Sequence, residues 1–185
     1  MCLDDFGLTT RSGPVFWLTG LSGAGKSTLA YRTSRQLAEQ GFHTIVLDGD
    51  VLRGGLNSDL NFSADGRAES VRRAAEVAAL CAKASIVVFV SLVSPFEAGR
   101  ARARQIIGPT FHEIYVEADY PTCNARDVKG FYKLAEAGQI QNFTGLTSPY
   151  EIPRTPELVV NTMTSDVLEC VGKLTDYALT HSGAK

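Results

Sequence analysis

The sequence lacks the features of a membrane protein, a zinc protein and a disulfide-rich protein. No apolar run in its 185 residues approaches the ~20 residues that a membrane-spanning helix needs. The cysteines, Cys2, Cys81, Cys123 and Cys170, are scattered, without a C-x-x-C pair or a histidine at ligand spacing, so neither zinc nor disulfides are expected. The three histidines form no cluster, and none is expected to be catalytic. The first residues, MCLDDFGLTT, are acidic rather than basic, which argues against a secretory signal and favours a cytoplasmic protein.

The chain also has little net charge. Its 18 Lys and Arg residues against 20 Asp and Glu give a formal charge of −2, so nucleic acid is not expected as its main partner. Arg100, Arg102 and Arg104 form a local basic cluster, which we interpret as a solvated helix face, with small-anion binding as the alternative. There is no internal repeat or low-complexity linker. Length and the 44% hydrophobic content predict one domain, residues 1–185.

Short apolar runs alternate with helical patterns along the chain. The runs predict strands at 15–19, 44–48, 86–91, 111–118 and 157–161. The helical patterns extend from the first run to about residue 40, across 67–84, across 97–107, briefly after 118, and from about 165 to 180. The piece after 48 is expected to be irregular. Continuous Val, Ile and Phe runs are typical of strands covered on both faces, so we expect a three-layer α/β fold with a central parallel sheet.

A glycine-rich segment, GLSGAGKST, separates the first predicted strand from the first predicted helix. Gly20, Gly23 and Gly25 allow positive φ angles, so successive N–H groups can point at an anion. A helix beginning near Lys26 adds the positive end of its dipole, Lys26 can reach the outer phosphates, and Ser27 can bind Mg²⁺. This is a complete G-x-x-x-x-G-K-[ST] pattern, typical of the P-loop NTPase fold; an ordinary flexible turn is the alternative. The predicted nucleotide-binding residues are Gly20, Leu21, Ser22, Gly23, Ala24, Gly25, Lys26, Ser27 and Thr28.

A second acidic motif, LDGD, ends the second predicted strand. It places Asp48 and Asp50 at the carboxyl edge of the sheet, where open α/β folds bind ligands. Asp50 is our candidate for accepting a proton from a substrate hydroxyl, while Asp48 caps or supports; the reverse assignment is the alternative. Ser27 and Asp48 are the candidate magnesium ligands. Arg53 can neutralise an anionic acceptor. The sequence lacks the N-K-x-D motif with which GTPases read the guanine base, so GTP is not favoured. The sequence therefore predicts a small-molecule kinase using ATP and Mg²⁺.

Residues 127–150 do not follow the alternation of strands and helices. They mix lysines and aromatics with glycine and proline, without a clear strand. Long segments of this kind are often functional. We expect a mobile lid that excludes water; a plain surface excursion is the alternative.

The motifs together resemble the adenylylsulfate kinase family. The resemblance rests on WLTGLSGAGKSTLA, LDGD..R.GLN.DL.FS, R.E..RR, SLVSP, RDVKGFYK.A..G.I.NFTG and PYE, in this order across residues 14–162. It implies transfer of the γ-phosphate of MgATP to the 3′-hydroxyl of adenylyl sulfate. It also implies a homodimer.

The resemblance assigns further roles residue by residue. It implies that Asp50, Arg53 and Arg67 contact the acceptor, and that Phe62 and Phe143 stack on either face of its adenine. Core packing is the alternative for each ring.

The resemblance also points to further residues of the phosphate and acceptor sites. Lys129 matches a lid lysine near the phosphates, and Ser94 matches a possible phosphoenzyme position. We expect Ser94 instead to line the acceptor pocket, since no base is evident near it. Ser70 and Val93 are further candidate acceptor contacts.

Several positions depart from the family pattern on the acceptor side. They are Val51, Asn61, Gly66, Ser70 and Leu134. Two other functions therefore stay open: a kinase of this fold with another alcohol as acceptor, and a non-catalytic nucleotide-binding subunit.

Overall fold

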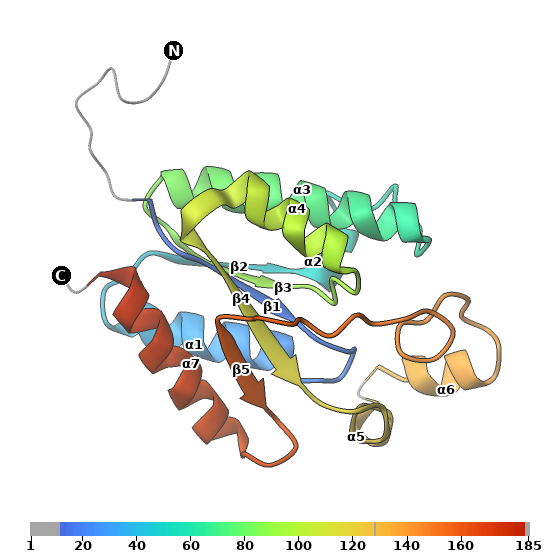
Figure 1. Ribbon diagram of the computed structural model, residues 1–185. Helices are drawn as coiled ribbons and strands as arrows, with labels where there is room; N and C mark the ends of the chain where they lie inside the picture. The colour runs from blue at the N-terminus through green and yellow to red at the C-terminus, as the bar shows by residue number, and fades with distance from the viewer. Residues whose placement is uncertain (1–11, 128, 184–185) are drawn as a thin grey trace.

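The computed structural model describes residues 12–127 and 129–183. Its sheet has five parallel strands in the order β2-β3-β1-β4-β5 (Figure 1). The strands are β1 (Val15–Thr19), β2 (Thr44–Asp48), β3 (Val87–Ser91), β4 (Phe111–Glu117) and β5 (Leu158–Asn161). The predicted three-layer α/β fold with a central parallel sheet is confirmed.

Helices cover both faces of this sheet. They are α1 (Lys26–Glu39), α2 (Gly49–Arg53), α3 (Ala64–Lys83), α4 (Glu97–Ile107), α5 (Tyr120–Arg126), α6 (Phe131–Glu136) and α7 (Val167–Ser182). The 3-10 turn η2 (Gly108–Thr110) follows α4. Figure 1 shows α3 and α4 on one face and α1 and α7 on the other. The expectation of an irregular piece after β2 was wrong, because Asp48 caps the short helix α2 by accepting a hydrogen bond from the Asp50 N–H. None of the helices in the described part of the chain is long and apolar enough to cross a bilayer.

The alternation of side chains along β1 divides the core between the two faces. Phe16 and Leu18 belong to the cluster that includes residues of α1 and α7, whereas Val15 and Trp17 pack with residues of α3. All five residues of β1 are buried. Because β1 is buried on both faces, it holds the start of the glycine-rich loop after Thr19 in a fixed position at the carboxyl edge of the sheet.

The parallel topology collects the candidate site residues at one edge. The carboxyl ends of all five strands lie at this edge. There the glycine-rich loop follows β1, Asp48 ends β2, and Ser94 follows β3. In the segment 127–150, α6 forms one short helix, and a single bridge joins Thr144 to Ser148. The acidic N-terminal residues, Cys2 among them, lie outside the described residues, as do residue 128 of the predicted lid and residues 184–185.

Candidate active site

The glycine-rich loop curls between β1 and α1. Gly23 and Gly25 have φ angles of +79° and +103°, and a Cβ at Gly20 would collide with the carbonyl oxygen of Val116. Glycine is therefore required for this path of the backbone. α1 begins at Lys26, and its N-cap residue, Gly25, has no side chain to cap it. The positive end of the helix dipole thus faces the loop, an arrangement that favours anions.

Lys26 lies within the curve of this loop. Its side chain is buried, and Nζ donates to the carbonyls of Gly20 at 2.9 Å and Leu21 at 2.7 Å. Burial lowers the pKa of Lys26 to about 8, because desolvation penalises the charged amine. The two carbonyls accept hydrogen bonds from the Lys26 ammonium but carry no net charge. A bound phosphate would supply the negative charge that balances it.

Ser27 and Asp48 face one another across the loop. The Ser27 hydroxyl donates to Asp48 Oδ2 at 2.5 Å and lies 3.1 Å from the hydroxyl of Ser91. Asp48 Oδ1 accepts from the Asp50 N–H at 3.0 Å, so the same carboxylate caps α2 and contacts the loop. A hydroxyl and one carboxylate suit Mg²⁺, which keeps several waters and phosphate oxygens in its shell. Among residues 12–127 and 129–183, no group of three or more His, Cys, Asp and Glu side chains forms a protein-only metal cage.

Asp50 meets the segment 127–150 through Lys129. The Lys129 ammonium forms an ion pair with Asp50 Oδ2, and both side chains are largely exposed. The structure thus brings together the predicted proton acceptor and the predicted lid lysine, although 79 positions separate them in the chain.

The acceptor-side residues cluster around the ring of Phe62. The guanidinium carbon of Arg53 lies 3.9 Å from the ring centroid, and that of Arg67 lies 5.6 Å from it. Arg67 also donates to the carbonyls of Phe62 at 3.1 Å and Asn142 at 2.7 Å, so it joins the start of α3 to the segment 127–150. Phe62 is 51% exposed, so its side chain is available to a flat ligand.

Phe143 and Ser70 have other partners. Phe143 is 8% exposed and packs edge-on against Tyr132, with ring centroids 4.8 Å apart. Core packing thus describes this ring in the structure, and its stacking on adenine stays a prediction. The buried hydroxyl of Ser70 accepts from Asn57 Nδ2 at 2.9 Å.

The loop after β3 holds Ser94 in a buried position. The Trp17 indole N–H donates to the Ser94 hydroxyl at 3.0 Å. A cavity of about 230 Å³ lies beside this loop and beside Arg67. Val93, the neighbouring candidate, contributes its carbonyl to a hydrogen bond from the Thr19 hydroxyl at 2.7 Å.

The interpretation of the basic cluster Arg100, Arg102 and Arg104 as a solvated helix face was wrong for Arg100. It was expected on a solvated helix face, but its side chain is only 3% exposed and forms an ion pair with Glu113. Its place on α4, three positions before the buried Ala103, is the one local signal for this burial. The partner, on β4, is separated from it by 13 positions and could not be assigned from spacing.

Comparisons with known proteins agree with this geometry. The model of the family described as adenylylsulphate kinase matches residues 12–161. An adenylyl-sulfate kinase of Clostridium acetobutylicum is 46% identical over 171 residues, which cover 92% of this chain and 86% of that protein. The chain belongs to the adenylylsulphate kinase family. The predicted family resemblance is confirmed.

Two solved structures of adenylylsulphate kinases are similar to this one. The Mycobacterium tuberculosis APS kinase CysC, solved in complex with AMPPNP and APS, has a TM-score of 0.87 and 40% identity, covering 90% of this chain and 98% of that one. A hexameric APS kinase from Thiobacillus denitrificans has a TM-score of 0.69 and 31% identity, covering 95% of this chain and 31% of that longer one. The first agrees with the predicted P-loop kinase fold over most of the chain.

Proposed function

We infer that this protein transfers the γ-phosphate of ATP to the 3′-hydroxyl of adenylyl sulfate, giving ADP and 3′-phosphoadenylyl sulfate. The observation that carries this inference is the arrangement at the carboxyl edge of the sheet. There the P-loop and Ser27 lie beside Asp48, while the neighbouring Asp50 contacts Lys129. The names of the relatives at 46% and 40% identity support the same reaction.

Each group has a defined task in this proposal. The P-loop N–H groups and Lys26 hold the phosphates of ATP, and Lys26 stabilises charge on the transferring phosphoryl group. Asp50 accepts the proton of the acceptor 3′-hydroxyl as the oxygen attacks the γ-phosphorus in line. Arg53 and Arg67 bind the anionic phosphosulfate of the acceptor, and Phe62 stacks on its adenine.

Lys129 changes partner in this account. In the structure it neutralises Asp50, and a carboxylate paired with an ammonium is a weaker base. We propose that Lys129 moves to the phosphates when ATP binds, which frees Asp50 to accept the proton.

Ser27 and Asp48 are the residues that would hold Mg²⁺. The ion would neutralise negative charge on the phosphates of ATP. Ser94 does not act as the nucleophile in this proposal, because its hydroxyl is buried and already accepts the Trp17 N–H. Direct transfer between the two substrates needs no phosphoenzyme.

We also propose that the protein works as a cytoplasmic homodimer, as the family resemblance implies. ATP and adenylyl sulfate are its partners in this account, with no main role for nucleic acid or a membrane. Size-exclusion chromatography with light scattering measures the oligomeric state, and a monomeric mass would contradict the dimer.

An acceptor panel tests the function. The protein is incubated with ATP, Mg²⁺ and one acceptor, either adenylyl sulfate, AMP, adenosine or a sugar alcohol, and ADP release is measured. We expect release with adenylyl sulfate, which Lys26→Ala abolishes. Release with another alcohol alone would indicate a kinase with a different acceptor. No release with any acceptor would indicate a nucleotide-binding subunit.

A further inference from the structure

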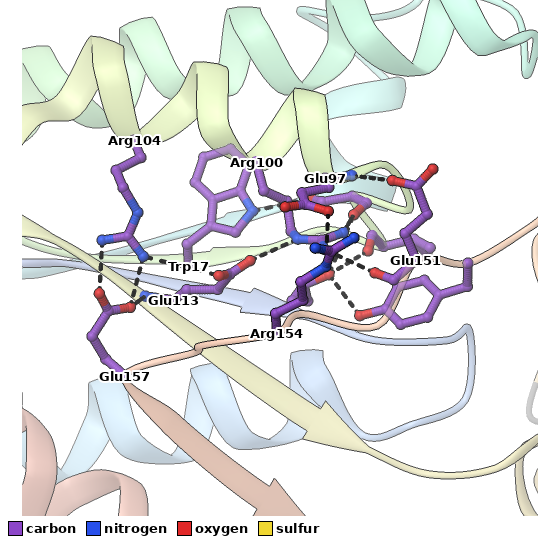
Figure 2. A network of polar contacts seen from close by, with 12 residues as sticks. Trp17, Glu97, Arg100, Arg104, Glu113, Glu151, Arg154 and Glu157 are labelled. Carbon is purple, nitrogen blue, oxygen red and sulfur yellow. Dashed lines mark hydrogen bonds and ion pairs between the residues drawn. The ribbon is translucent and has the colours of Figure 1, made fainter.

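A buried arginine, Arg100, joins three segments of the chain. It donates from Nε to Glu113 Oε1 at 2.6 Å, from Nη1 to the Ser94 carbonyl at 2.8 Å, and from Nη2 to the Glu151 carbonyl at 2.8 Å. These partners lie on β4, on the loop after β3, and just beyond the segment 127–150. Figure 2 shows Arg100 reaching from α4 toward both Glu113 and Glu151. Arginine suits this position because its planar group presents five N–H donors in fixed directions.

Glu151 has two further contacts with the region that begins at Ser94. Its backbone N–H donates to the Pro95 carbonyl at 2.8 Å, and its carboxylate accepts from the Glu97 N–H at 2.6 Å (Figure 2). The N-cap residue of α4, Phe96, provides no capping side chain, so the carboxylate of Glu151 caps this helix from a distant part of the sequence. The end of the segment 127–150 is thereby bound to residues 94–97.

Ser94 adopts a backbone conformation that needs such support. Its φ angle is +44°, a value that residues other than glycine seldom adopt. The Trp17 N–H holds its side chain and Arg100 holds its carbonyl. Replacing the guanidinium would leave this carbonyl and the Glu113 carboxylate buried with fewer partners, so the loop would relax.

The other side of the same loop forms a wall of the 230 Å³ cavity. The cavity is lined in part by Arg67, Ser94, Pro95 and Phe96. Arg100 is not among its lining residues, although Ala98 and Gly99 just before it are, so it can affect a bound ligand only indirectly, through the loop and the start of α4. The contacts of Lys26 and Ser27 with their neighbours do not involve Arg100.

We propose that Arg100 is a positioning residue for the acceptor. It holds residues 94–96, with Ser94 in its strained conformation, in the shape that forms the cavity wall beside Arg67, and it ties this wall to Glu151. The identity of the acceptor in this inference rests on the proposed function. Loss of the guanidinium fork should therefore weaken use of the acceptor and leave use of ATP unchanged.

The variants Arg100→Lys and Arg104→Lys test this inference as a matched pair. Arg104 lies one helical turn farther along α4, 3.9 Å from Glu113, and forms a bidentate pair with Glu157. Figure 2 shows it directed away from Glu151. Arg100→Lys should raise the KM for adenylyl sulfate roughly ten-fold or more, because lysine cannot make all three bonds. The KM for ATP, and both KM values of Arg104→Lys, should stay within about two-fold of wild type.

Three kinetic results would overturn the inference. Equal increases in both KM values, or unchanged KM values in folded Arg100→Lys, would limit Arg100 to a role in stability. If Arg100→Lys does not fold, Trp17→Phe is the second variant. It removes the N–H donated to Ser94 together with part of a buried ring, and its KM for adenylyl sulfate should rise while that for ATP does not. Unchanged values in Trp17→Phe would also contradict the proposal.

Hydrogen exchange gives a readout that is independent of the acceptor. In the ligand-free protein, Arg100→Lys should speed exchange at residues 92–96 and 149–152, and Arg104→Lys should not. Unchanged exchange in Arg100→Lys would contradict the tie between the two segments. If the wild type does not phosphorylate adenylyl sulfate, the proposed function fails, while this comparison still decides whether Arg100 holds the loop.

Discussion

The hydroxyl of Ser27 lies 2.5 Å from a carboxylate oxygen of Asp48, although 21 positions separate the two residues in the chain. This contact joins the start of α1 to the end of β2. It places a neutral and a charged oxygen beside the P-loop, where the phosphates of ATP are expected. The pair is the structural basis of the proposed magnesium site.

Asp48→Asn should raise the Mg²⁺ concentration for half-maximal turnover. Loss of an oxygen ligand, or of the group that orients one, costs roughly 10- to 100-fold in metal affinity. Ser34→Ala is the matched control, since Ser34 also joins α1 to β2, with its hydroxyl 2.8 Å from that of Thr44. A magnesium titration of turnover measures both variants. An unchanged midpoint for Asp48→Asn would remove Asp48 from the metal site.

The pH dependence of stability should report the buried amine of Lys26. Its pKa is about 8 in the folded protein and 10.5 for an ordinary lysine, as in the unfolded chain, so between these pH values the unfolded chain binds more protons. The contribution of Lys26 to the free energy of unfolding therefore rises with pH over this window.

Lys26→Met should lack this rise. The free energy of unfolding of the variant minus that of wild type should be about 2 kcal/mol smaller at pH 9.5 than at pH 7. This value follows from the lowering of the Lys26 pKa. Urea unfolding at both pH values measures the difference, with the exposed Lys83→Met as control. A pH-independent difference between Lys26→Met and wild type would contradict the lowered pKa.

Phe62 and Phe143 should respond differently to truncation. Phe62→Ala should weaken acceptor binding about 5- to 150-fold, the range for one base–aromatic stack, with little change in stability. Phe143→Ala should lower the free energy of unfolding by about 3 kcal/mol, because its ring is buried against Tyr132.

Calorimetric titration and urea unfolding separate these effects. If Phe143 also stacks on the adenine when ligands bind, Phe143→Ala should weaken acceptor binding and leave ATP affinity unchanged. Equal weakening of both ligands would show that the ring packs the segment 127–150 instead.

Ligands should slow hydrogen exchange in residues 127–150. Tyr132 already donates to the Ser22 carbonyl at 2.7 Å, Lys129 already pairs with Asp50, and the Asn142 carbonyl already accepts from Arg67, so parts of the segment are anchored without ligands. ADP with adenylyl sulfate should order the stretch around Gly138 and Gly145 further. The helix α7 provides an internal control. Equal exchange with and without both ligands would contradict a lid.

Local patterns were sufficient to predict the strands, the long helices and the P-loop. Each depends on residues close in sequence, such as the continuous apolar run of β1 followed by glycines and Lys26. The helix α2 was missed because five residues carry no periodicity, although Asp48 is a capping residue type.

Long-range contacts explain what the sequence could not predict. The sequence around Arg100 is typical of a surface residue. Its bonds to Glu113 and to the carbonyls of Ser94 and Glu151, the last 51 positions away, make its burial tolerable. The ion pair between Lys129 and Asp50 likewise depends on the tertiary structure, which brings the segment 127–150 next to the start of α2. Such pairings are set by tertiary structure rather than by spacing.

The identity of the phosphorylated product tests the central claim most directly. The protein is incubated with ATP, Mg²⁺ and adenylyl sulfate, and the products are analysed by mass spectrometry and by NMR of the ribose. The account predicts ADP and a nucleotide heavier than adenylyl sulfate by one phosphoryl group, carried on the 3′-oxygen. Asp50→Asn should form it roughly 100-fold or more slowly, while still binding ATP. ADP formed without this nucleotide, or a phosphoryl group on another oxygen, would contradict the account.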